Sequence, residues 1–148
     1  MKYKLFLITF LCLACSLSAW AGEIEVEHYS ANPDMQLPFS DAVRVGNMLY
    51  LSGKIGNEPG TRNLAEGGIA GETRQTLENI KASLEKHGSS LGEVVKCTVF
   101  LADIQEWAAM NEVYMQYFPT DPPARSAMGV GGLALGARVE IECLATVR

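Results

Sequence analysis

The chain has 148 residues, and its 17 Asp and Glu against 12 Lys and Arg give a formal net charge of −5 at pH 7. Non-specific nucleic-acid binding depends on clustered Lys and Arg that neutralise phosphates, and this sequence holds no such cluster. The composition therefore argues against a nucleic-acid partner and favours a single domain that binds a small molecule.

The first residues have the three-part pattern of a secretory signal peptide. Lys2 and Lys4 give a positive start, residues 5–13 are almost wholly apolar, and a small-x-small motif ends at Ala21. The apolar run is shorter than the roughly 20 residues that a membrane-spanning helix needs. We therefore expect a signal peptide over residues 1–21 and an exported protein, either periplasmic or secreted.

After cleavage, residues 22–148 would form one domain with no membrane association. No internal repeat, low-complexity tract or linker divides this part of the sequence. A lipoprotein anchored through Cys15 is the alternative, although Cys12 stands where a large aliphatic residue is expected.

Two cysteines, Cys97 and Cys143, lie outside the expected signal peptide. They form no C-x-x-C pair, and the only histidines, His28 and His87, are isolated in the sequence, so we expect no metal site and no cofactor. Each cysteine lies within an apolar strand pattern, which favours two small buried core residues. A disulfide between them in an oxidising compartment is the alternative.

Two short runs, residues 42–45 and 48–51, flank Gly46-Asn47. Two strands separated by two such residues are typical of a β-hairpin, because glycine accepts the positive φ of a tight turn. Residues 57–71 are rich in Gly, Asn and Pro and are expected to form a loop.

Helical spacing predicts a first helix over residues 72–87. Its apolar stripe is formed by Leu77, Ile80 and Leu84. Gly88 follows the last turn, as is typical of a helix end.

The second helix is expected to begin at Asp103 as N-cap, with Glu106 completing a capping box, and to end before Pro119. Its inner stripe consists of Trp107, Met110, Tyr114 and Tyr117. Helical spacing makes this stripe a core-packing face, and an aromatic ligand-binding box is the alternative.

Residues 94–101 and 138–147 are predicted strands. Strands that alternate with helices indicate an α/β domain with both helices on one face of the sheet. One side of the first strand carries Val95, Cys97, Val99 and Leu101, whereas the opposite sheet face places Phe100 and Leu144 beside charged residues. Because that mixed face is too apolar for water in so small a domain, we expect an oligomer that covers it.

Arg125 and Glu142 are the candidate site residues. Arg125 follows two prolines, and its planar guanidinium suits a carboxylate with two parallel hydrogen bonds. Glu142 projects from the mixed face, where a carboxylate can take a proton from water and return it. A purely structural Arg125–Glu142 ion pair at the interface is the alternative. Glu140, on the same face, is interpreted as a solvated or interface charge.

Six segments resemble successive blocks of the RidA/YjgF family, in order and at similar spacing. They are residues 37–43, 51–55, 75–80, 95–101, 123–126 and 139–142. The most specific are Pro123-Ala124-Arg125-Ser126 and Val139-Glu140-Ile141-Glu142. The resemblance implies a chorismate-mutase-like α/β (α+β) fold, with a mixed sheet and two helices on one face. It also implies a homotrimer with three clefts between subunits.

The family resemblance implies an activity as well: hydrolysis of the C=N bond of reactive enamines and imines to 2-keto acids and ammonia. The implied substrates are of the 2-iminopropanoate and 2-iminobutanoate class. Arg125 would bind the substrate carboxylate, and Glu142 would position or activate the attacking water. Ala127, Gly53 and Phe39 would line the substrate pocket.

The sequence departs from the family pattern in places. Phe39 stands where Tyr is common, the glycine-rich residues 129–136 differ, and a signal peptide is unusual because the enzymes that release 2-aminoacrylate usually work in the cytoplasm. A non-catalytic trimer that binds small carboxylates, or a chaperone-like trimer, is the alternative function. An isomerase related by fold analogy and a ribonuclease are less favoured, the second because the chain is acidic.

Overall fold

The computed structural model describes residues 23–30 and 37–148, so the expected signal peptide over residues 1–21 lies outside the described residues. The strands are β1 (Val26–Ser30), β2 (Ser40–Val45), β3 (Met48–Leu51), β4 (Lys54–Ile55), β5 (Val94–Leu101), β6 (Ala124–Gly129) and β7 (Val139–Thr146). The helices are α1 (Gly68–Lys86) and α2 (Trp107–Tyr117). No helix within the described ranges has the length and apolar character needed to cross a membrane.

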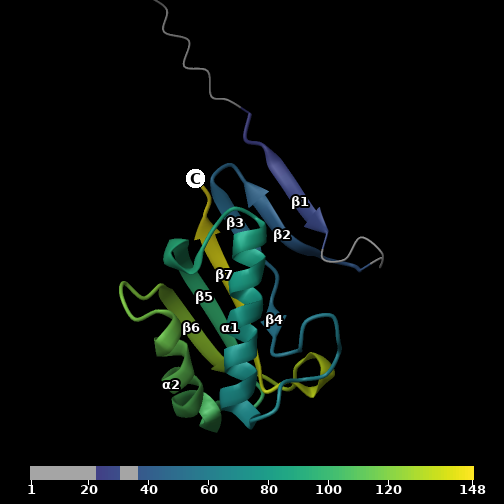
Figure 1. Ribbon diagram of the computed structural model, residues 1–148, viewed down its shortest axis with the longest axis vertical. Coiled ribbons are helices and arrows are strands. Elements are labelled where there is room, and N and C mark those ends of the chain that lie inside the picture. The colour runs from purple at the N-terminus through teal and green to yellow at the C-terminus, as the bar shows by residue number, and fades with distance from the viewer. Residues whose placement is uncertain (1–22, 31–36) are drawn as a thin grey trace, which may run out of the picture.

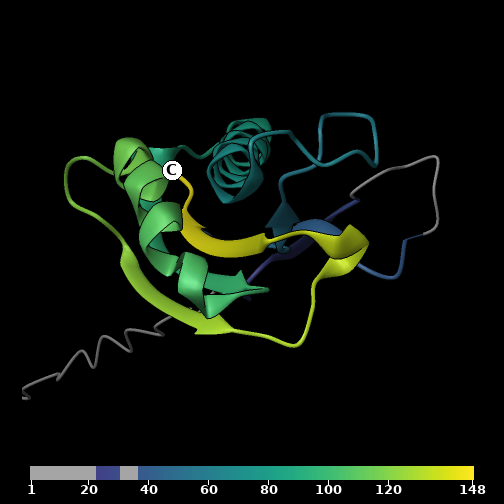
Figure 2. The same ribbon diagram turned by 90° about the horizontal axis from the view of Figure 1, so that it is seen from below.

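The sheet has the order β1-β2-β3-β7-β5-β6, and β4 pairs with β7 beside it. β5 and β6 are parallel and are joined through α2, whereas the other pairs are antiparallel, so the sheet is mixed as expected. Both helices lie over the same side of the sheet (Figure 1). Seen from below, β6 runs along the outer edge of the sheet beneath α2 (Figure 2). The strands β1, β4 and β6 are additional to those predicted.

One core lies between the helices and the sheet. From α1 it contains the predicted stripe of Leu77, Ile80 and Leu84, all with no exposed surface. Burial alternates along β7: Val139, Ile141, Cys143 and Ala145 are buried, whereas Glu142 on the opposite side is exposed. The face of the sheet without helices, which we call the open face, therefore carries the mixed set of side chains that the alternation predicted.

Two corrections concern the predicted strands and the first helix. Val95 is exposed, and Val94 takes its place in the core, because a register shift between Val94 and Lys96 turns the chain at the start of β5. α1 begins at Gly68, four residues before the predicted start. Gly71 does not interrupt the helix; it allows close packing, since a Cβ there would collide with the carbonyl oxygen of Glu66.

The start of the second helix also differs from the prediction. Asp103 accepts a hydrogen bond from the backbone N of Gln105 at 2.9 Å and caps a short 3₁₀ turn, and α2 follows from Trp107. Glu106 does not complete a capping box, because its side chain accepts a hydrogen bond from Arg138. Met110 and Tyr114 are buried as expected, but Trp107 is 46% exposed.

Cys97 and Cys143 face each other across β5 and β7 and form a disulfide. Both residues are buried in the core, as predicted. The interpretation as two unpaired core residues is wrong, because the strand register places them directly opposite one another.

Candidate active site

Arg125 occupies the edge strand β6. It pairs with Cys97 of β5 in parallel register, so its side chain points to the helix-covered face. The guanidinium carbon lies 4.6 Å from the centroid of the Tyr114 ring, a cation–π contact with α2. Arg125 is half-buried, yet among the described residues it forms no ion pair. A half-buried guanidinium without a counter-charge among the described residues is suited to binding an anion.

The surroundings of Arg125 form a hollow of about 520 Å³, which we call the arginine hollow. Its other lining residues are Trp107, Ala108, Asn111, Tyr114, Met115, Pro122 and Pro123. The hydroxyl of Tyr114 is buried and has no hydrogen-bond partner among the residues that the structure describes. Burial raises the pKa of Tyr114 to about 12, against the opposing effect of Arg125, so this hydroxyl stays protonated and remains a potential donor.

A second hollow, of about 550 Å³, lies around Glu140 and is called the glutamate hollow below. Phe39, Asp41, Ser52, Gly53, Lys54, Ile55, Asn57 and Ala134 line it together with Glu140. Glu140 pairs with Ile55 of β4, which places its side chain against the backbone of Gly53. A Cβ on residue 53 would collide with the Glu140 carboxylate, so the absence of a side chain there gives this carboxylate its position.

Asp41, one of the lining residues, links the wall of the glutamate hollow to helix α1. Its carboxylate accepts hydrogen bonds from Lys54, from the Ser83 hydroxyl at 2.9 Å and from His87 Nε2 at 2.8 Å. Burial acts to raise the pKa of Asp41, but the hydrogen bonds from Lys54 and His87 outweigh it and hold the pKa at about 2. The Asp41 backbone oxygen also accepts a hydrogen bond from Ser52 N at 3.1 Å, which ties β2 to the segment that contains Gly53.

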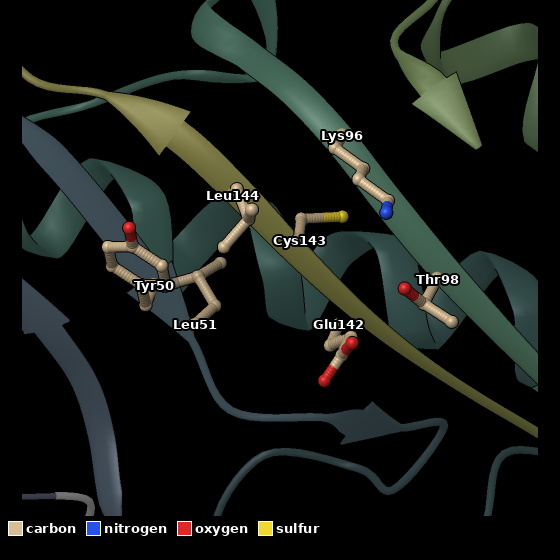
Figure 3. A pocket seen from close by; sticks show the side chains of 7 residues that line it. All are labelled: Tyr50, Leu51, Lys96, Thr98, Glu142, Cys143 and Leu144. Carbon is tan, nitrogen blue, oxygen red and sulfur yellow. The ribbon is translucent and has the colours of Figure 1, made fainter. Parts of the chain in front are cut away.

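Glu142 lies in a third, smaller hollow of about 310 Å³ on the open face. Figure 3 shows it with Tyr50, Leu51, Lys96, Thr98, Cys143 and Leu144. The predicted projection of Glu142 from the open face is confirmed, because it is exposed between the buried Ile141 and Cys143 of β7. Within the part of the chain that the structure describes, neither Lys96 nor Arg125 forms an ion pair with it.

The structure thus distributes the predicted site residues over separate places. Phe39 and Gly53 meet in the glutamate hollow, but Glu140 joins them there and Glu142 does not. Ala127 lies on β6 two residues after Arg125 and packs against the core. Arg125 and Glu140 point to opposite faces of the sheet, so one copy of the chain does not bring them together.

Glu140 is the residue that the sequence interpretation left aside. No local sequence pattern identifies it, because the feature that separates it from Glu142 is its pairing with the two-residue strand β4, which follows Gly53 directly. Among the described residues, no three His, Cys, Asp or Glu side chains gather in a way that could hold a metal ion.

Comparison with known proteins gives consistent matches. A family model described as Endoribonuclease L-PSP matches residues 29–147. A RutC family protein of Pyrococcus horikoshii is 46% identical over 108 residues, which is 73% of this chain and 86% of that protein. The human 2-iminobutanoate/2-iminopropanoate deaminase is 44% identical over 108 residues, 73% of this chain and 79% of that protein. The crystal structure of RidA from an Antarctic Psychrobacter has a TM-score of 0.72 at 39% identity, covering 84% of this chain and 98% of that one.

Proposed function

Because the chain belongs to the Endoribonuclease L-PSP family, the family of the RidA/YjgF proteins, we propose that it is an imine deaminase. The substrates would be reactive enamines and imines of the 2-iminopropanoate and 2-iminobutanoate class, hydrolysed to 2-keto acids and ammonia. The observation that carries this proposal is Arg125, a half-buried guanidinium without an ion-pair partner among the described residues. It supplies the anchor that a 2-imino acid carboxylate requires.

The complete site would form between copies of the chain. The arginine hollow and the glutamate hollow lie on different faces of one copy, so a substrate bound to Arg125 needs a carboxylate from a neighbour. The open face supports such an assembly, because Val26, Tyr50 and Met128 expose apolar surface there. We propose a homotrimer in which each cleft joins the arginine hollow of one protomer to the glutamate hollow of the next.

The reaction in such a cleft follows from the chemistry of the imine. Arg125 holds the carboxylate, and a protonated C=N group is electrophilic enough to accept water. A glutamate on the sheet removes a proton as the water oxygen bonds to the imine carbon, and then returns it to the nitrogen. The C–N bond then breaks and ammonia leaves, while the glutamate takes the proton of the former water hydroxyl, so that its oxygen becomes the carbonyl oxygen of the 2-keto acid. Glu140 is favoured for this role over Glu142, since it shares its hollow with Phe39 and Gly53.

The test is a coupled assay in which an amino-acid oxidase generates 2-iminopropanoate and its decay is followed with and without purified protein. Wild type should accelerate the decay, and Arg125→Ala should lower kcat/KM on the order of a hundredfold, because it removes a charged anchor. Glu140→Gln should lower kcat by 10² or more. Glu142→Gln is the matched control two residues along the same face and should stay within a few-fold of wild type.

The outcomes separate the candidate functions. Acceleration that survives in Arg125→Ala would refute the role of this residue. Loss of activity in Glu142→Gln but not in Glu140→Gln would transfer the proton-transfer role to Glu142. A wild type that binds 2-keto acids but accelerates nothing would instead be a non-catalytic carboxylate-binding trimer.

We also propose that residues 1–21 are a signal peptide and that the protein is periplasmic or secreted. The Cys97–Cys143 disulfide supports this, because disulfides persist mainly in oxidising compartments. Mass spectrometry of the protein recovered from cell fractions should give a mature chain that begins at Gly22. A chain that begins with a lipid-modified Cys15, or an uncleaved cytoplasmic chain, would contradict the proposal.

A further inference from the structure

Trp107 lies at the surface, although helical spacing assigned it to the core. It is the first residue of α2 and is 46% exposed, whereas Met110 and Tyr114, on the same predicted stripe, are buried. The preceding 3₁₀ turn, capped by Asp103, sets the start of the helix and leaves the indole beside the arginine hollow. An indole that gains little from core packing is available to contact a ligand.

The walls of the arginine hollow are mostly apolar and partly rigid. Met115, which is 61% exposed, lines it two turns further along α2. Pro122 and Pro123 line it from the segment that leads into β6. Proline fixes its backbone φ, so this wall is pre-formed. Among the described residues that line it, none is acidic and Arg125 alone is charged. The hollow thus combines one anchor for an anion with an apolar volume beside it.

We propose that the arginine hollow binds the substrate side chain and makes the protein selective for 2-imino acids with bulky apolar or aromatic side chains. This inference rests on the proposed function, because it places the substrate carboxylate on Arg125. A volume of about 520 Å³ lies in the usual range of ligand pockets and is far more than the methyl group of 2-iminopropanoate can fill. A phenyl or isobutyl group would bury apolar surface against Trp107 and Met115, which favours binding.

The size of the preference follows from the area that the ligand buries. Full burial of an aromatic side chain changes affinity by more than tenfold, and the hollow is open on one side, so we expect about a tenfold preference for a phenyl over a methyl group. Most of this preference should disappear when the indole is removed, because Trp107 has the largest aromatic side chain among the lining residues.

The test is calorimetric binding of the stable products pyruvate and phenylpyruvate to the purified protein, which does not require turnover. Wild type should bind phenylpyruvate about tenfold more tightly than pyruvate. Trp107→Ala should bring the two affinities within about twofold of each other, mainly by weakening the binding of phenylpyruvate. Ile104→Ala removes another exposed apolar side chain, one that does not line the hollow, and should retain the preference.

Several results would overturn the proposal: equal affinities in wild type, a preference that persists in Trp107→Ala, or no binding of either acid. Sedimentation of Trp107→Ala at the same concentration gives a further check. A variant that loses its assembly but keeps its selectivity would show that the indole is a subunit contact. Imine turnover is measured separately on the same samples. A protein that prefers phenylpyruvate but hydrolyses no imine would refute the deaminase proposal and leave the side-chain site standing.

Discussion

Reduction of the Cys97–Cys143 disulfide should destabilise the protein by about 4 kcal/mol. The bond closes a loop with a sequence separation of 46 residues. In the chain-entropy description, a cross-link over a loop of this length removes roughly 13 to 14 cal/mol/K from the unfolded ensemble, which is about 4 kcal/mol at 25 °C. For a domain of roughly 125 residues this corresponds to a decrease in Tm of about 15 °C.

The assay is urea unfolding of the same wild-type sample with and without a thiol reductant, at one fixed protein concentration because assembly also affects apparent stability. The double variant Cys97→Ala/Cys143→Ala is the control: its stability should be low and should not respond to the reductant. Free-thiol titration of the oxidised protein should find neither cysteine. Equal unfolding midpoints for the oxidised and reduced wild type, or titration of Cys97 and Cys143 before reduction, would refute this reasoning.

Two further predictions concern the glutamate hollow. Gly53→Ala should force the flexible Glu140 side chain to move, so we expect a change in stability below about 1 kcal/mol but a loss in kcat/KM on the order of a hundredfold. The control is Gly131→Ala, which should leave stability and kcat/KM unchanged because a Cβ there would meet nothing within 4 Å. A fully active Gly53→Ala would contradict the placement of Glu140. Because the pKa of Asp41 in the folded protein, about 2, lies below its ordinary 3.8, its ionised carboxylate stabilises the fold above about pH 4, and this contribution is lost as the pH falls towards 2. At pH 7 the free energy of unfolding of Asp41→Asn should therefore be about 1 to 2 kcal/mol below that of wild type, after allowance for solvent screening. In urea titrations near pH 2 the two free energies should become equal. A difference in unfolding free energy that does not vary with pH would contradict this.

The elements that the sequence predicted are those with a long, regular pattern. β5 and β7 each have eight residues with alternating apolar positions, and α1 has a helical stripe, so burial against one core determines all three. Apart from Met128, β6 has only small or polar residues around Arg125, and it has little intrinsic strand preference. It becomes a strand because β5 offers it a free edge, which no local pattern reveals.

The alternation of side chains along β7 predicts which face of the sheet carries the candidate site, but not which residue on that face belongs to it. Glu140 and Glu142 lie on the same face of β7, so a period of two residues does not distinguish them. The distinction comes from β4, which pairs with Ile141 and Glu140 and is too short to have a period of its own. The disulfide could not be predicted for the same reason. Cys97 and Cys143 lie opposite one another only because of the register between β5 and β7, which are far apart in the sequence.

Shared clefts lead to a prediction that a site within one protomer does not make. Arg125 lies on the helix-covered side of an edge strand and Glu140 on the open face, so each protomer would give one half of two different clefts. Arg125→Ala and Glu140→Gln chains should each be nearly inactive alone. When they are unfolded, mixed in equal amounts and refolded together, about one cleft in four receives an intact arginine from one chain and an intact glutamate from the next, given closed cyclic symmetry. Mixed trimers should regain about a quarter of the wild-type activity, and no recovery in verified hybrids would show that the two residues do not act in one cleft.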